Sequence, residues 1–151
     1  MSLRTDIEAK FIEAMKAKEA DKVSTYRMLR AAFKNAEIDK QIAQLSDDQV
    51  IEVVGREVKK LKDALADFEK AGRTELKEKT EAELALLSGF LPAQLSEAEV
   101  LSAVAAKAAE LGLSGEAAYG RLMGEVMKDL KGKADGGTVG KAVKEFLQNK
   151  N

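Results

Sequence analysis

Apolar residues recur every three or four positions along most of the chain, the spacing that gathers them on one face of an α-helix. Two such stripes occupy the ranges 3–19 and 21–41, and we expect these two helices to form an antiparallel hairpin. Ser2 is expected to cap the first helix, because its hydroxyl can accept a hydrogen bond from a free backbone N–H. The side chains expected to face inward are Leu3, Ile7, Phe11, Ala14, Met15, Tyr26, Leu29, Phe33 and Ala36.

A long central helix is predicted to begin after Ser46. Ser46 and Gln49 have the spacing of a capping box, in which each side chain accepts a hydrogen bond from the backbone N–H of the other residue. This helix is expected to end near Gly72, since glycine suits the left-handed conformation that follows many helices. A further helix is predicted from Thr74 and is stopped by Pro92, which lacks a backbone N–H. Its inward positions are expected to be Leu76, Thr80, Leu84 and Leu87.

A domain boundary is predicted around the single proline. Ser96 and Glu99 repeat the capping box and predict a new helix that ends at Gly112. We therefore expect an all-α protein with an N-terminal helical hairpin or bundle domain over residues 1–92. A small C-terminal domain of three helices is expected over residues 95–151.

The C-terminal part is rich in glycine, since most of the 11 glycines fall in the range 112–140. Short helices and tight turns are typical of such a composition. One helix is predicted over 119–130 and a loop over 131–137. Thr138 is expected to cap the last helix, whose inward residues are Val139, Ala142, Val143, Phe146 and Leu147.

Composition excludes several kinds of chemistry. The chain has no cysteine and no histidine, so it offers no thiolate nucleophile, no thiolate or imidazole metal ligand and no imidazole general base. We assign no catalytic residue, no metal site and no cofactor. No apolar run approaches the roughly 20 residues that span a bilayer, and no apolar leader follows the first residues. The sequence thus predicts a cytoplasmic protein without a membrane partner.

Basic residues gather in the glycine-rich part of the chain. At 100° per residue, the basic residues of the 119–130 helix lie opposite its apolar face, and those of the last helix do the same. Such a stripe suits a phosphate backbone, although a solvated helix surface gives the same pattern. The candidates for nucleic-acid binding are Arg121, Lys128, Lys131, Lys133, Lys141 and Lys144.

Residues 119–136 read YGRLMGEVMKDLKGKADG, which resembles the hallmark of the GatB/YqeY superfamily. The segments 26–30 (YRMLR), 68–73 (FEKAGR) and 90–96 (FLPAQLS) are similar to the YqeY-like proteins. The resemblance implies two helical domains, the second related to the tail of the GatB subunit. In the glutamine-dependent aspartyl/glutamyl-tRNA amidotransferase, that tail helps to hold tRNA. The resemblance further implies that tRNA contacts the backbone at Gly120, Gly124 and Gly132.

Three functions stay open at this point. The first is a non-catalytic accessory module that binds tRNA or an enzyme that modifies or aminoacylates tRNA. The second is a protein-interaction module that uses the N-terminal helices. The third is an amidotransferase-like carbon-nitrogen ligase with glutamine as amido donor, a label that the resemblance would bring although the enzyme's catalytic parts are absent. We expect no intrinsic activity.

Overall fold

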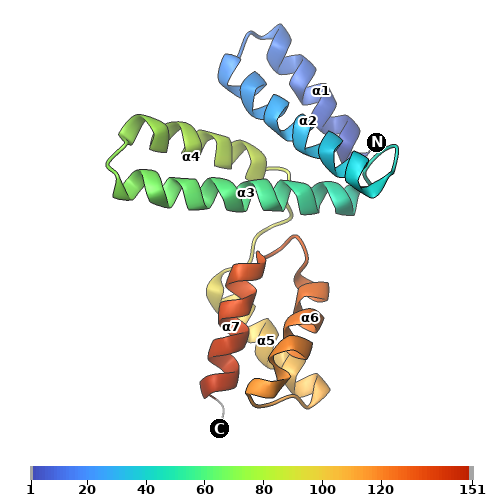
Figure 1. Cartoon of the computed structure of the whole chain (residues 1–151), viewed down its shortest axis with the longest axis vertical. Helices are drawn as coiled ribbons and strands as arrows, with labels where there is room; N and C mark the ends of the chain where they lie inside the picture. Colours follow the sequence, from blue (N-terminus) through green and yellow to red (C-terminus); the bar gives the residue numbers. More distant parts are fainter. Residues whose placement is uncertain (1, 150–151) are drawn as a thin grey trace. The chain divides into compact units, whose positions relative to one another are not determined.

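Every regular element that the computed structural model describes, over residues 2–149, is a helix, so the predicted all-α class is confirmed. The chain divides into two compact units, Met1–Leu91 and Pro92–Asn151, whose helices are drawn in Figure 1. Each unit has its own apolar core. That each unit folds on its own stays a prediction, which limited proteolysis between residues 89 and 96 would test.

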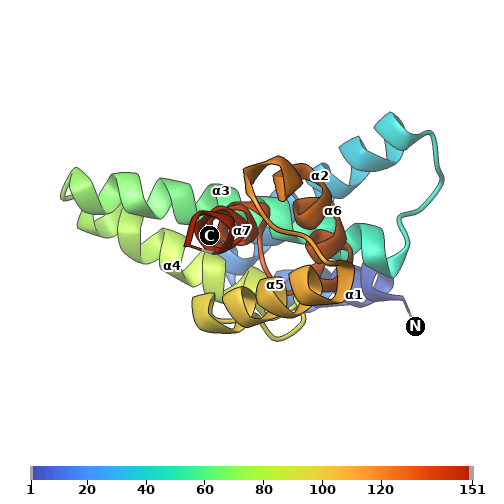
Figure 2. The same cartoon turned by 90° about the horizontal axis from the view of Figure 1, so that it is seen from below.

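The first unit consists of two helical hairpins. One is formed by α1 (Leu3–Lys16) and α2 (Ala20–Lys40), and the other by α3 (Asp47–Lys70) and α4 (Thr74–Ser88). Figure 2 shows α3 and α4 running alongside each other. The side chains that share the core come from all four helices and include Ile7, Phe11, Leu29, Phe33, Val50, Val54 and Leu87.

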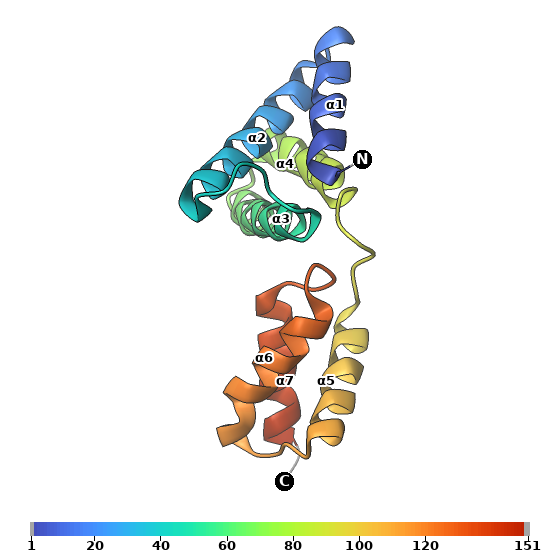
Figure 3. The same ribbon diagram turned by 90° about the vertical axis from the view of Figure 1, so that its right-hand side faces the viewer.

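The second unit is a three-helix bundle made of α5 (Glu97–Leu111), α6 (Tyr119–Leu130) and α7 (Gly136–Asn149). Each of these helices packs against the other two, as Figure 3 shows. A short 3₁₀ turn, η1 (Glu116–Ala118), precedes α6 and was not anticipated from the sequence. The buried side chains of the bundle include Val100, Val104, Leu122, Val126, Val139 and Val143.

Serine side chains cap the starts of α1, α3 and α5, as predicted. The Ser46 hydroxyl accepts from the Gln49 N–H at 3.3 Å, and the Gln49 side chain accepts from the Ser46 N–H at 2.9 Å. The same pair of bonds joins Ser96 and Glu99, each at 3.1 Å. The Ser2 hydroxyl accepts from the Thr5 N–H at 3.1 Å. These bonds satisfy amides that would otherwise lack a partner in the first helical turn.

Three local expectations are wrong. Helix α1 ends at Lys16 rather than near residue 19, since Lys18 adopts a left-handed conformation with φ 57°. Met15 and Leu76 lie near helix ends, where less of the chain covers them, and are 42% and 38% exposed instead of inward. Thr138 does not cap the last helix, because its own N–H donates to the Asp135 carboxylate at 2.8 Å. Asp135 is the capping residue.

We expect Ser46→Ala and Ser96→Ala each to lower the free energy of unfolding by about 1 kcal/mol, because each change removes the acceptor of a helix-start amide. Urea unfolding followed by circular dichroism measures the loss. Ser102, exposed inside α5, provides the control. Ser102→Ala should stay within about 0.5 kcal/mol of the unmodified protein. Equal effects of all three substitutions would contradict the assignment of the caps.

Candidate nucleic-acid interface

The core of the second unit determines which face α6 presents to solvent. Leu122, Val126 and Leu130 follow one another at intervals of four residues and are 0%, 1% and 7% exposed. Arg121 and Lys128 are seven residues apart, so they share one direction on the opposite, exposed side of the helix. The predicted segregation of apolar and basic side chains on this helix is therefore present.

An acidic residue next to this face, Asp129, forms an ion pair with a lysine of α5. Lys107 of α5 places its Nζ 2.8 Å from Asp129 Oδ2 and 3.2 Å from Glu110 Oε2. The hydrogen bond to Asp129, followed by that to Glu110, raises the pKa of the Lys107 amine. Glu125 pairs with Lys128 at 3.5 Å, but the Lys128 side chain is highly exposed, where such a pair contributes little. The sequence pattern gave no indication of the pairing between Lys107 and Asp129.

The turn after α6 carries the next two basic residues, Lys131 and Lys133, both exposed. The segment before α5 holds the backbone of this turn in place. The Gln94 side-chain amide donates to the Gly132 carbonyl at 2.7 Å, and the Leu95 N–H donates to the Lys133 carbonyl at 2.9 Å. Gly132 has a backbone φ of 80°, which residues other than glycine rarely adopt. The turn is thus a defined structure that positions its lysines at the end of α6.

The two lysines of α7 have different surroundings. Lys141 borders a hollow of about 230 Å³ together with Glu97 and Glu145. Lys144 borders another, of about 430 Å³, together with Glu116 and Tyr119. Carboxylates accompany both lysines, so the local field there is less positive than on α6. The six predicted residues form two groups, one on α6 and the following turn and one on α7.

The glycines of α6 leave its backbone open. A Cβ atom placed on Gly120 or Gly124 would meet nothing within 4 Å. Neither glycine is therefore in close contact with another part of this chain. The close approach occurs instead at Gly140 of α7, where a Cβ would lie 3.0 Å from the hydroxyl of Tyr119 and 3.7 Å from the terminal methyl of Met123. Contact of a ligand with the backbone of α6, which the resemblance implies, stays a prediction.

The remaining clearly displaced pKa values among the described groups have structural causes. The backbone N–H of Ser96, and then its hydroxyl, lower the pKa of Glu99 within the capping box. Burial is the main cause that raises the pKa of Tyr26, whose ring contacts Phe90 in the first core. Helix capping thus explains the shifted pKa of Glu99, and packing in the core explains that of Tyr26.

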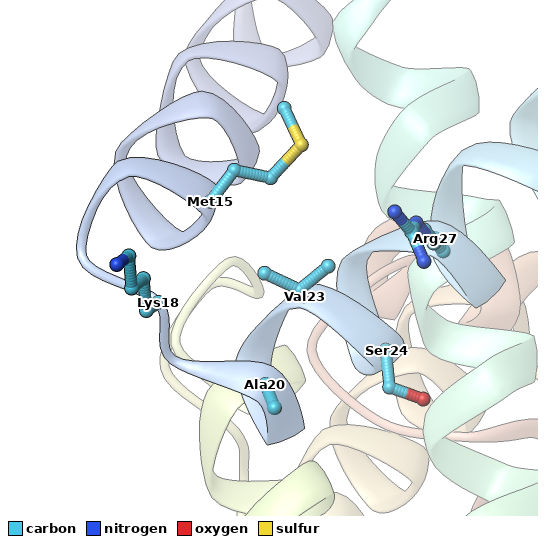
Figure 4. A pocket seen from close by; sticks show the side chains of 6 residues that line it. All are labelled: Met15, Lys18, Ala20, Val23, Ser24 and Arg27. Carbon is cyan, nitrogen blue, oxygen red and sulfur yellow. The ribbon is translucent and has the colours of Figure 1, made fainter.

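The first unit has a surface hollow of its own where α1 meets α2. Its volume is about 530 Å³, and it is lined by Met15, Lys18, Ala20, Val23, Ser24 and Arg27 (Figure 4). The side chains of Met15 and Val23 lie on the two helices that border it.

Over the described residues, no helix is both long and apolar enough to cross a membrane, and no group of three or more carboxylates could hold a metal ion.

These features define an all-helical protein of two units whose second unit presents a basic, glycine-containing helix face. The chain belongs to the Yqey-like protein family, whose model matches residues 4–147. It is 30% identical over 147 residues to altered inheritance of mitochondria protein 41, mitochondrial, from Pyrenophora tritici-repentis, a match covering 93% of this chain and 78% of that protein. An uncharacterized protein of Schizosaccharomyces pombe is 31% identical over 96 residues, covering 63% of this chain and 76% of its own.

We expect Gly124→Ala to raise the free energy of unfolding by about 0.5–1 kcal/mol, because an exposed glycine inside a helix costs conformational entropy and its Cβ position is empty. Gly132→Ala is the matched control and should destabilise the protein, since alanine is strained at a positive φ. Urea unfolding measures both. Destabilisation by Gly124→Ala would mean that the α6 backbone is not open as described.

Proposed function

We propose that this protein is a non-catalytic accessory module that binds tRNA through α6 and the turn at residues 131–133. The supporting observation is the outward direction shared by Arg121 and Lys128 on a helix whose Gly124 backbone is open. Two exposed cations on one helix face can contact successive phosphates of a nucleic-acid strand. Gly124 adds no side chain to this face, so a strand can approach the helix backbone closely at that position, beside Glu125.

The balance of charge at this surface favours an anionic ligand. Arg121, Lys128, Lys131 and Lys133 contribute positive charges, and Glu125 is the acidic residue on the same side. The charge of Asp129 is partly offset by Lys107, which also pairs with Glu110. Contacts of this kind recognise the phosphate backbone and not the base sequence, so binding should be weak, dependent on salt and only mildly selective. Such a surface suits a module that assists an enzyme on tRNA.

The resemblance of residues 119–136 to the tail of GatB supports tRNA as the nucleic acid. Lys141 and Lys144 belong to the proposal only as secondary contacts, since both lie beside carboxylates. An amidotransferase-like ligase activity is not part of the proposal. A site of action in the cytoplasm also stays a prediction, and the relative from Pyrenophora tritici-repentis carries a mitochondrial name.

We expect Arg121→Ala with Lys128→Ala to lower the slope of log affinity for tRNA against log salt by about one to two, because each lost phosphate contact removes about 0.7–0.9. Fluorescence anisotropy of labelled tRNA at several salt concentrations measures the slope. Lys59→Ala with Lys62→Ala, at exposed positions of α3, changes the net charge equally and should leave the slope unchanged.

A further variant tests whether the ion pair between Lys107 and Asp129 affects tRNA binding. Lys107→Gln leaves the Asp129 carboxylate without its partner and should weaken tRNA binding, although residue 107 need not contact the ligand. Absence of tRNA binding by the unmodified protein at low salt would refute the proposal. An equal fall in slope for the α3 control would show that only net charge matters.

A further inference from the structure

A groove in the first unit lies between the start of α2 and one face of α4. Its volume is about 850 Å³. Helix α2 contributes residues 21, 22 and 25, and the rest of the lining comes from α4. The α4 side chains that matter for its chemistry are Glu75, Glu78, Lys79, Ala82, Glu83 and Leu86.

The groove follows α4 lengthwise. Its lining positions on that helix are residue 75 followed by the neighbouring pairs 78/79, 82/83 and 85/86, and each group lies three or four residues from the one before, so they form one continuous face. Eleven steps at about 1.5 Å each give a length of roughly 16 Å. Ala82, Ala85 and Leu86 make part of this face apolar. An elongated ligand with an apolar stripe fits such a shape, and an amphipathic helix of a partner protein has both properties.

The edges of the groove are acidic. Asp21, Glu75, Glu78 and Glu83 line it, and none of these four carboxylates forms an ion pair with another described residue. Of the two lysines in the lining, Lys22 pairs with Glu19 at 3.1 Å. The groove therefore has a surplus of negative charge that is not neutralised within the unit. A phosphate backbone is repelled by this field, and a cationic ligand is attracted.

From this combination we infer that the groove between α2 and α4 binds a basic amphipathic helix of a partner protein. The apolar side of the helix contacts Ala82, Ala85 and Leu86, and its lysines or arginines face Glu75, Glu78 and Glu83. Charge complementarity of this kind speeds association and selects against acidic partners. The inference stands on residues of the first unit and is independent of the proposed tRNA contacts on α6.

The test is a display selection with the full chain as target and a library of helix-forming peptides of about twelve residues, a length that matches the groove. Binding of the selected peptides is then measured by fluorescence anisotropy for three variants. Glu78→Lys with Glu83→Lys reverses the charge of the groove. Ala82→Trp obstructs its apolar part without a change of charge. Asp63→Lys with Asp67→Lys, exposed on α3 and outside the groove, is the control of equal charge.

We expect the selection to enrich peptides in which lysine or arginine flanks an apolar stripe. The charge reversal and Ala82→Trp should each weaken their binding by a factor of about ten, and the α3 control by less than about a factor of two. Circular dichroism confirms that each variant keeps its helices. Failure to enrich any peptide, enrichment of neutral or acidic peptides, or an equal loss in the α3 control would each overturn the inference.

Discussion

The face that α6 presents to solvent depends on the burial of Leu122, Val126 and Leu130 between the other helices of the second unit. Burying such a side chain contributes about 1.5–3 kcal/mol, more than an exposed ion pair provides. A rotation of α6 that covered Arg121 or Lys128 would expose this stripe and bury a charge. The apolar core therefore decides the direction of the basic side chains, and the proposed tRNA surface follows from it.

Polar contacts complete the surface that the core orients. Lys107 draws the Asp129 carboxylate toward α5, while Gln94 and Leu95 hold the turn that carries Lys131 and Lys133. Asp135 then caps α7 and ends the turn. In the first unit the acidic lining of the groove lies along α4. The groove of the first unit and the exposed face of α6 therefore differ in the charge of their side chains, as their two proposed ligands do.

Local rules sufficed for most helix boundaries, because a capping box and an apolar stripe act within one or two helical turns. They failed where two residues could cap the same helix, since Asp135 caps α7 in place of Thr138. They also failed at the end of α1, where Met15 is exposed because few residues pack against it. The buried and exposed faces of α6 were also predictable from its helical period, whereas a binding role of its basic side chains stays a prediction. The pairing of Lys107 with Asp129 was not, because it depends on how two separate helices pack.

We propose that tRNA contacts the face opposite the α6 core and not the first unit. The most direct test is a titration of the ¹⁵N-labelled full chain with unlabelled tRNA at low salt, followed by amide chemical shifts. We expect the largest shifts on residues 120–133, around Arg121, Gly124 and Lys128, while α2 and α4 stay unperturbed. Shifts concentrated in the first unit, or confined to Lys141 and Lys144 of α7, would contradict it.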